Sequence, residues 1–182
     1  KSLNEALAHC TPDEEIFIPY LNEHKDWKMI IAPHVIGEDH LSQIMHLLEG
    51  RRVVRYTQAT EETVGEADVL IIDCFGLLSS IYRYADVTYV GGGFGAGIHN
   101  LLEAAVWTKP DVFGPNNARF QEAQDLKASQ GGGEITDGNS FKTVMDNIIS
   151  DRKAYDMSAN AAGEYVKQKA GATDAVLKML NL

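Results

Sequence analysis

A glycine-rich segment, residues 91–103, carries the clearest chemical potential in the chain. Five glycines within seven residues are followed by His99, Asn100 and Glu103. Glycine allows positive φ angles and close approach of a ligand, and the N–H groups at a following helix suit a phosphate. The three polar side chains share one helix face, where a carboxylate can accept both ribose hydroxyls. The segment predicts a phosphate-and-ribose site; the alternative is a surface turn before an ordinary helix.

Two further loops follow apolar runs that are typical of buried strands. Asp73 to Leu78 follows the run 69–72, and Gly76 there could offer backbone groups to a base edge. In the alternative, Asp73 only caps a helix from Leu77 and Phe75 packs in the core. The run 29–32 ends in Pro33 and His34, and His34 could donate to a phosphate or carboxylate or be purely structural. Both loops are therefore candidate ligand sites.

Other polar residues favour structural interpretations. The turn 113–117 ends another apolar run, and its Asn117 can cap the next helix. The tyrosines Tyr82, Tyr84 and Tyr89 are interpreted as core or interface aromatics. The remaining histidines lack metal-ligand spacing and are interpreted as surface residues: His9, His24, His40 and His46.

The elements that must position these loops alternate between short β-branched runs and amphipathic stretches. The expected strands are 29–32, 53–54, 69–72, 87–90 and 112–113, and the expected helices are 11–24, 38–48, 77–85, 99–107, 120–129, 141–149 and 155–182, with Gly171 as a break and Thr173 or Asp174 as a cap beyond it. Residues 7–10 fit either a first strand or the end of a leading helix. The alternation predicts an α/β fold, a doubly wound Rossmann-like parallel sheet.

Composition narrows the functional classes. The chain has 182 residues, a net charge of −10 and 45% hydrophobic residues, which fits a single globular domain. The acidic balance argues against nucleic acid as a partner. The sequence has no transmembrane segment and no signal peptide, so we expect this chain to be soluble. Its two cysteines lack the spacing of a zinc site, and no metal site is expected.

The chain resembles a known family, most specifically between residues 73 and 122. The motifs that carry the resemblance are Phe75-Gly76-Leu77-Leu78, Tyr82-Arg83-Tyr84-Ala85-Asp86-Val87, Gly91-Gly92, His99-Asn100 with Leu102-Glu103-Ala104, Lys109-Pro110, Phe113-Gly114-Pro115 and Ala32-Pro33-His34. They resemble the carboxyl-terminal half of the bacterial 3-deoxy-D-manno-octulosonic acid (Kdo) transferases of lipopolysaccharide synthesis. The resemblance runs from about residue 11 to the end of the chain.

The resemblance implies an inverting glycosyltransferase of the two-domain GT-B fold that needs no cofactor or metal. Residues 1–182 would be the single nucleotide-sugar (donor) binding domain, and the amino-terminal acceptor domain would be absent from this chain. The donor implied is CMP-Kdo. The acceptor implied is a lipid A precursor, which the missing domain would bind at the cytoplasmic face of the inner membrane. The general base would also lie there, so we assign no catalytic residue here and expect the isolated chain to be inactive.

By position in the family, Pro33 and His34 would face CMP, the loop 75–77 would line the base, and Glu103 would hold the ribose. Together with the glycine segment, the predicted nucleotide-binding residues are Pro33, His34, Phe75, Gly76, Leu77, Gly92, Gly93, Gly97, His99, Asn100, Leu101, Leu102 and Glu103.

Three positions depart from the pattern of many members. Histidine stands at 34 in place of arginine, leucine at 77 in place of glutamate, and leucine at 101 in place of proline. Histidine is charged only part of the time near neutral pH, so a phosphate contact from His34 would depend on pH. Two alternatives stay open: a GT-B lobe or epimerase that uses a UDP-sugar, and a non-catalytic Rossmann-like binding module. A dinucleotide oxidoreductase is disfavoured because G-x-G-x-x-G does not follow the first strand.

Overall fold

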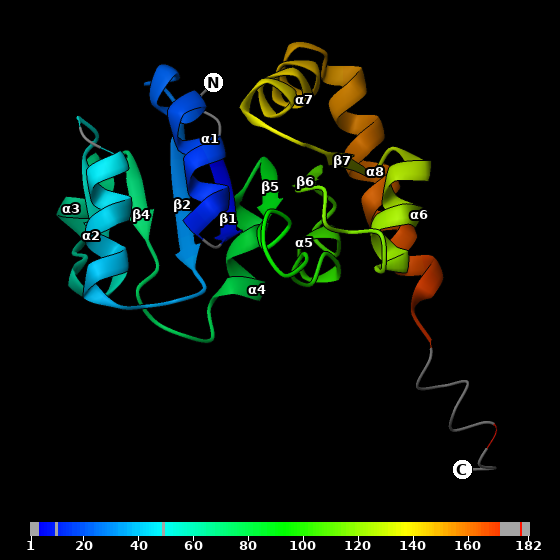
Figure 1. Cartoon of the computed structure of the whole chain (residues 1–182), viewed down its shortest axis with the longest axis horizontal. Helices are drawn as coiled ribbons and strands as arrows, with labels where there is room; N and C mark the ends of the chain where they lie inside the picture. The colour runs from blue at the N-terminus through cyan, green and yellow to red at the C-terminus, as the bar shows by residue number, and fades with distance from the viewer. Residues whose placement is uncertain (1–3, 10, 49, 172–178, 180–182) are drawn as a thin grey trace.

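The computed structural model describes residues 4–9, 11–48, 50–171 and 179. Its centre is a parallel sheet with the strand order β3-β4-β2-β1-β5-β6-β7. The strands are β1 (Asn4–His9), β2 (Lys28–Pro33), β3 (Val53–Arg55), β4 (Val69–Ile71), β5 (Val87–Val90), β6 (Asp111–Phe113) and β7 (Gly132–Glu134). In Figure 1 the strands run from β4 on the left through β2, β1 and β5 to β7 on the right. The predicted doubly wound α/β sheet is confirmed.

The first strand decides the open question at the amino terminus. β1 pairs in parallel with β2 on one side and with β5 on the other. Residues 4–9 are therefore a central strand, and the alternative of a leading helix is wrong. Successive strands after β1 extend the sheet on the β2 side until β5 returns to the other side of β1. This reversal creates the point at which open α/β sheets bind ligands.

Helices connect the strands and cover both faces. They are α1 (Thr11–Glu23), α2 (Glu38–Leu47), α3 (Glu61–Glu66), α4 (Leu78–Ile81), α5 (Leu102–Ala105), α6 (Gln121–Ser129), α7 (Gly138–Ser150) and α8 (Arg152–Lys169). The predicted helix 77–85 is divided into α4 and the 3-10 helix η2 (Tyr82–Tyr84). The helix predicted from Tyr155 begins at Arg152 and ends at Lys169. Thr173 and Asp174 lie outside the described residues.

Two elements were not expected from the sequence. α3 begins at a reciprocal capping box between Thr60 and Thr63, inside a segment without a clear apolar face. β7 pairs with β6 although two of its three residues are glycines, which are depleted in strands. α3 thus depends on a local cap without a buried face, whereas β7 depends on its pairing at the sheet edge.

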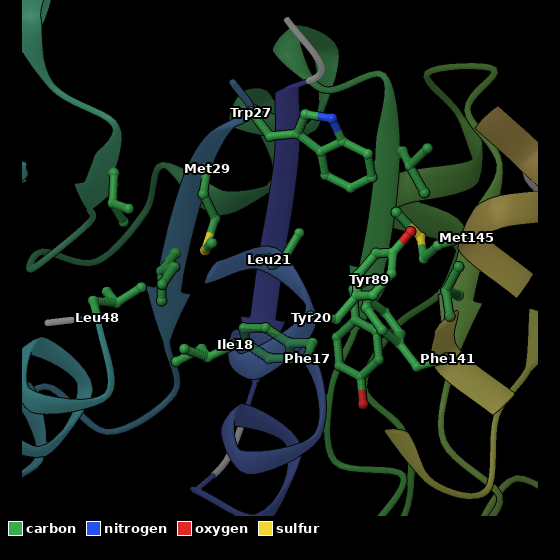
Figure 2. Close-up of a cluster of buried hydrophobic side chains, with 14 of the residues drawn as sticks. Phe17, Ile18, Tyr20, Leu21, Trp27, Met29, Leu48, Tyr89, Phe141 and Met145 are labelled. Atoms are coloured by element: carbon green, nitrogen blue, oxygen red, sulfur yellow. The ribbon is translucent and has the colours of Figure 1, made fainter. Parts of the chain in front are cut away.

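Alternating strand side chains form two cores. Met29 and Ile31 pack with α1, α2 and α7 on one face, where Figure 2 shows Phe17, Tyr89 and Phe141 in contact. Residues on the opposite side of the strands, such as Val90 and Phe113, pack with α4, α5, α6 and α8. Burial on both faces explains why the strands read as continuous apolar runs. Among the helices of the described residues, none is long and apolar enough to span a bilayer.

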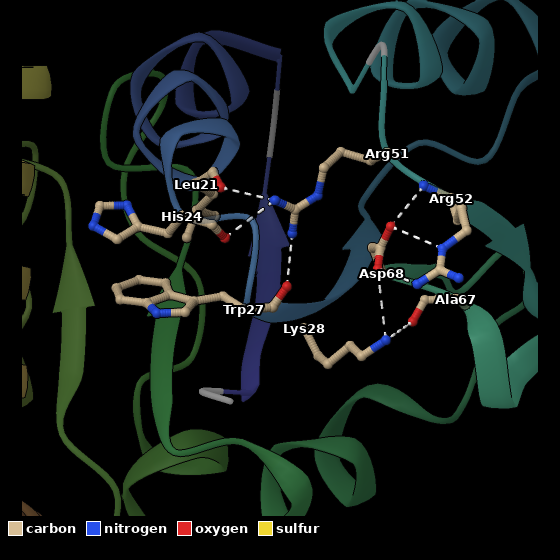
Figure 3. Close-up of polar contacts among 8 residues, drawn as sticks. All are labelled: Leu21, His24, Trp27, Lys28, Arg51, Arg52, Ala67 and Asp68. Atoms are coloured by element: carbon tan, nitrogen blue, oxygen red, sulfur yellow. Dashed lines mark hydrogen bonds and ion pairs between the residues drawn. The ribbon is translucent and has the colours of Figure 1, made fainter. Parts of the chain in front are cut away.

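A cluster of charges fixes the amino ends of β2, β3 and β4. Arg51 donates to the carbonyl oxygens of Leu21, His24 and Trp27 at 3.2, 3.1 and 2.7 Å, which satisfies the last turn of α1 and the chain that leaves it. Next to it Arg52 donates to both carboxylate oxygens of Asp68, at 3.2 Å from Nε and 3.0 Å from Nη2 (Figure 3). These contacts attach α1 and β4 to the start of β3.

Candidate functional site

A pocket of about 360 Å³ opens at the carboxyl edge of the sheet, beside the reversal of strand order. Its wall is formed by the residues that follow β2, β4 and β5, and by α4 and η2. It is lined by Ala32, Pro33, His34, Ile36, Ile72, Cys74, Phe75, Gly76, Leu78, Tyr82, His99, Asn100 and Glu103. The volume lies in the range of small-molecule sites, which are apolar with a few convergent polar groups. This pocket is the candidate functional site.

The structure brings together seven of the thirteen predicted site residues. Pro33, His34, Phe75, Gly76, His99, Asn100 and Glu103 line the pocket. The other six, Leu77, Gly92, Gly93, Gly97, Leu101 and Leu102, do not line it. Leu101 is fully buried in the core, and Leu102 lies with Val106 and Trp107 in an adjoining surface hollow that shares Asn100 and Glu103 with the pocket. Contact between any of these residues and a nucleotide stays a prediction.

The polar side of the pocket is formed where the loops after β2 and β5 meet. The imidazole rings of His34 and His99 stack with 4.8 Å between their centroids and 26° between their planes. Asn100 donates from Nδ2 to Oε1 of Glu103 at 3.1 Å, and its Oδ1 accepts from the Leu102 N–H at 3.1 Å. Asn100 therefore orients the carboxylate of Glu103 and satisfies an N–H at the start of α5.

The glycine segment forms a compact turn behind His99. The Gly92 carbonyl accepts from the N–H groups of Gly95 and Gly97 at 3.0 and 3.1 Å, and Gly92 has a φ of 90°. A Cβ atom on Gly92 would lie 2.4 Å from the Gly97 carbonyl oxygen. One on Gly93 would lie 2.5 Å from Cα of Gly114 in the loop after β6. The glycines thus allow the tight backbone that supports His99, rather than lining the pocket.

The helix expected from His99 begins only at Leu102 and is four residues long. A helix this short has a weak dipole, so the expected contribution of a helix amino terminus is smaller than the sequence implied. The polar residues nevertheless meet, because the Asn100–Glu103 hydrogen bond holds the turn before the helix.

The loop after β4 presents Phe75 to solvent. Its side chain is 83% exposed at the pocket rim, so the alternative in which Phe75 packs in the core is wrong. Gly76 has a φ of 88°, and a Cβ there would meet nothing within 4 Å. The open space at Gly76 leaves its backbone accessible to a ligand. The exposed ring of Phe75 offers a surface for stacking.

Sequence reasoning missed Tyr82 as a pocket residue. Its side chain is almost fully buried yet lines the pocket floor, so it is both core and site. Burial raises the pKa of Tyr82, and the nearby carboxyls of Asp111 and Glu103 raise it further. The hydroxyl therefore stays protonated as a hydrogen-bond donor. Its position four residues after Leu78, which also lines the pocket, is the signal that could have identified it.

A second missed group lies at the start of α1, directly after β1. Asp13 is fully buried and accepts from the Tyr89 hydroxyl at 2.6 Å and the Gly92 N–H at 3.2 Å. It joins α1 to β5 and to the glycine segment, whose partners lie 76 and 79 positions away in the sequence. The sequence showed only a helix start at these residues, since such distant partners leave no local signal.

Two of the histidines interpreted as surface residues are not simply exposed. His40 contacts the buried carboxylate of Glu14 at 2.8 Å through Nε2 and the Val35 carbonyl at 2.8 Å through Nδ1. His24 is half-buried, with its ring 4.3 Å from those of Tyr20 and Trp27. His46 is exposed as expected, and the side chain of His9 lies outside the described part of the structure.

Two predicted helix caps are also wrong. Asp73 does not cap α4, because its carboxylate accepts from the N–H of Thr57 at 2.8 Å and contacts Arg55 at 2.9 Å. Asn117 does not cap α6, because its side chain donates to the Gly114 carbonyl and to Glu134. Both side chains instead connect loops at the carboxyl edge of the sheet.

Comparison with known proteins agrees with the resemblance that the sequence motifs indicate. No protein-family model matches the sequence. The chain is 31% identical to a 3-deoxy-D-manno-octulosonic acid transferase of Aquifex aeolicus over 48% of the chain and 26% of that protein. It is 28% identical to the enzyme of the same name from Chlamydophila psittaci over 79% of the chain and 34% of that protein. The chain thus spans about a quarter to a third of the length of these curated relatives.

Solved structures give the fold. The chain matches the C-terminal CMP-Kdo binding domain of WaaA from Acinetobacter baumannii with a TM-score of 0.74 and 21% identity, over 92% of the chain and 90% of that domain. It matches Anabaena Alr3699/HepE, solved with UDP-glucose, with a TM-score of 0.65 and 15% identity over 92% of the chain and 44% of that protein. The chain therefore has the fold of the carboxyl-terminal half of a GT-B glycosyltransferase, and the resemblance to the bacterial Kdo transferases that its sequence predicted is confirmed.

Proposed function

We propose that this chain is the donor-binding domain of a Kdo transferase and that its carboxyl-edge pocket binds the nucleotide of CMP-Kdo. The observation that carries the proposal is the convergence of two histidines, an oriented carboxylate and an open backbone on one pocket. The Kdo transferases among its relatives and the CMP-Kdo binding domain that shares its fold support the choice of nucleotide sugar.

Each part of the pocket matches one part of a cytidine nucleotide. The apolar wall of Ile72, Cys74 and Leu78 can receive the base, and the backbone at Gly76 can meet its polar edge. The Glu103 carboxylate can accept the ribose hydroxyls, as an acidic residue does in dinucleotide folds. His34 and His99 lie on the polar side, where either can donate to a phosphate oxygen.

The reaction that follows is an inverting transfer of Kdo to a lipid A precursor. A hydroxyl oxygen of the acceptor forms a bond to the anomeric carbon of Kdo while the bond from that carbon to the CMP phosphate breaks. The hydroxyl proton passes to a carboxylate base that the proposal places outside this chain, and the phosphate takes the electron pair. Imidazole and backbone donors here stabilise the leaving CMP, with no metal required.

The proposal assigns the whole protein to lipopolysaccharide synthesis at the cytoplasmic face of the bacterial inner membrane. This chain supplies donor binding and stabilises the leaving group, so the purified chain alone should transfer no Kdo. Turnover of CMP-Kdo by the purified chain would contradict this division of labour.

The decisive experiment is an amide-shift titration of the chain with CMP and, separately, UMP, without added metal. We expect CMP to shift the amides of Gly76 and of residues 99–103 and to bind more tightly than UMP. Glu103→Ala should weaken CMP binding about tenfold or more, because a charge-assisted contact is lost. Glu62→Ala on the exposed surface of α3 is the matched control and should leave the affinity unchanged.

The other outcomes separate the rival functions. Tighter binding of UMP would replace the proposal with a domain that uses a UDP-sugar, as the complex of Alr3699/HepE with UDP-glucose would suggest. Absence of shifts with both nucleotides at millimolar concentration would contradict nucleotide binding by this chain and favour a non-catalytic module.

A further inference from the structure

One guanidinium joins the two loops that follow the neighbouring strands β2 and β4 and that both line the pocket. Arg55 is the last residue of β3 and does not itself line the pocket. Its Nη1 and Nη2 donate to the two carboxylate oxygens of Glu38 at 2.9 and 2.8 Å. Its Nε donates to Oδ2 of Asp73 at 2.9 Å. Arg55 thus holds two carboxylates from two different segments of the chain.

Each of these carboxylates stands next to a wall of the pocket. Glu38 is the first residue of α2 and ends the loop that carries Pro33, His34 and Ile36. Asp73 directly precedes Cys74, Phe75 and Gly76, which also line the pocket. Backbone pairing of β2 with β4 ends before these loops, so a connection between Glu38 and Asp73 further constrains the spacing between His34 and the 74–76 loop.

The connection is anchored at Asp73, whose side chain is fully buried. Besides Arg55, Asp73 accepts from the Thr57 N–H at 2.8 Å and from the Thr57 hydroxyl at 2.6 Å. Burial acts to raise the pKa of Asp73, but the hydrogen bonds from Thr57 and Arg55 outweigh it and hold that pKa below its ordinary value. The Asp73 carboxylate is therefore charged and held in place at the start of the loop.

We propose that Arg55 is a positioning residue that sets the width of the nucleotide pocket by holding the loop after β2 and the loop after β4 at a fixed separation. This inference rests on the proposed function for its ligand, but the arrangement of the loops is a property of the free protein. It assigns a functional role to an edge-strand arginine that touches no part of the pocket surface.

The shape of the guanidinium is essential to this role. Its planar fork can meet a carboxylate with two parallel hydrogen bonds and still present Nε to a second one. Lysine keeps the positive charge but offers a single flexible ammonium group, so it cannot hold both carboxylates in one geometry. Arg55→Lys therefore separates a positioning role from a purely electrostatic attraction of the anionic nucleotide.

The first test needs no nucleotide. Amide hydrogen exchange should become about tenfold faster or more in Arg55→Lys and Arg55→Gln at Thr57 and at residues 74–76, since their tether is released. Amides of the central strand β5 should keep the wild-type rate. Arg52→Gln is the matched control, because it breaks an arginine–aspartate fork at the opposite end of the same two strands. Unchanged exchange at Thr57 and 74–76 in both Arg55 variants would overturn the proposal.

The second test measures CMP affinity together with thermal stability. Arg55→Lys should raise the Kd for CMP about tenfold with little change in melting temperature, whereas Arg52→Gln should leave the Kd at the wild-type value. In a double-mutant cycle, Glu38→Gln should add little to Arg55→Lys, because both remove the same link. Wild-type affinity in Arg55→Lys would show that the charge alone matters and would overturn the proposal.

The two proposals fail in different ways. If the wild-type chain binds no CMP, the proposed function fails, and the exchange measurements still decide whether Arg55 fixes the loops. If the wild type binds CMP and the Arg55 variants bind it equally well while staying folded, only the positioning role fails. Arg55→Lys retains a cation beside Asp73. The positioning role therefore remains testable with that variant even if Arg55→Gln fails to fold.

Discussion

The two ends of β3 and β4 carry the same pair of residue types in different settings. At the amino end, Arg52 contacts Asp68, with Lys28 also 3.6 Å from that carboxylate. At the carboxyl end, Arg55 contacts Asp73 and Glu38. One carboxylate is shared by two cations at the first end, and one cation is shared by two carboxylates at the second.

The difference lies in what each pair connects. Residues near the Arg52–Asp68 pair are already held by the backbone pairing of Val53 with Val69, so that pair repeats a constraint of the sheet. The Arg55 pairs join loops beyond the last paired residues, where no strand ladder fixes the separation. An ion pair therefore contributes most to geometry where the backbone does not already determine it, and that is where the pocket lies.

The largest predicted difference between the carboxyl and amino edges of the sheet concerns two glycines with positive φ. Gly92 at the carboxyl edge has a φ of 90° and Gly50 near the amino edge a φ of 82°. A Cβ on Gly92 would overlap the Gly97 carbonyl, whereas one on Gly50 would meet nothing within 4 Å. Gly92→Ala should cost about 3 kcal/mol of unfolding free energy and abolish CMP binding.

Gly50→Ala is the matched control and should cost only about 1 kcal/mol, the strain of a left-handed conformation. Urea unfolding and the CMP titration measure both effects. Equal losses of stability for the two variants would show that backbone conformation alone, and not the crowded turn, governs the carboxyl edge.

A second, smaller contrast appears at acid pH. A hydrogen bond from Arg52 lowers the pKa of Asp68, and contacts with Thr57 and Arg55 hold down that of Asp73 against the effect of burial. Each charged carboxylate thus stabilises the fold above the unfolded pKa of about 3.9, and the contribution is lost as pH falls through the lower folded pKa. We expect Asp68→Asn to remove about 2 kcal/mol of this acid dependence and Asp73→Asn to remove less.

For CMP affinity we expect the opposite order, with the larger effect at Asp73 and the smaller at Asp68. Asp73→Asn should weaken CMP binding, because it loosens the loop beside the pocket, whereas Asp68→Asn should not. Unfolding curves at pH 3 and pH 7, together with the Kd for CMP at pH 7, test this reversal. A loss of affinity in Asp68→Asn would remove the distinction between the two ends.

The last prediction concerns Asp111, a carboxyl at the start of β6 that lacks a cation partner in the described residues. It is fully buried, it accepts a hydrogen bond from the Thr88 hydroxyl, and its Oδ2 has no hydrogen-bond partner among the described residues. Burial raises the pKa of Asp111 well above its ordinary value, although the Thr88 bond acts against this. The folded state therefore retains a proton that the unfolded chain releases, and stability falls as pH rises above about 4.

Asp111→Asn should remove that slope, so its stability relative to the wild type should rise between pH 4 and pH 7. Chemical unfolding at the two pH values measures the change. A constant difference between variant and wild type would mean that Asp111 is already ionised in the folded protein, which would make it resemble Asp73.

The sequence predicted the fold wherever a strand has a continuous apolar run. β2, β4 and β5 were recognisable because both faces of a central strand are buried. The same reasoning left β1 undecided, since its assignment depends on pairing with β2 and with β5, the latter about 80 positions away. It also missed β7, whose glycines have no strand preference and which is recognised by its pairing with β6.

The site was predictable in its loops but not in its connections. Each pocket loop follows an apolar run, and the carboxyl ends of parallel strands meet at one edge, which brought His34, Gly76 and His99 together. The side chains that hold these loops, such as Asp13 and Arg55, act on partners far away in sequence. Local spacing carries no trace of such contacts, so only the three-dimensional structure shows them.

The approach of Gly93 to Gly114 has a consequence for how such a domain can diverge. Each backbone occupies the place where a Cβ of the other would stand, at 2.5 and 2.8 Å. Neither position can compensate for a larger residue at the other, since both are already the smallest residue. Exposed pocket residues such as His34 and Phe75 face no comparable barrier to exchange. Residues of the pocket loops can therefore change while the glycine pair persists, which makes that pair the better marker for finding distant members of the fold.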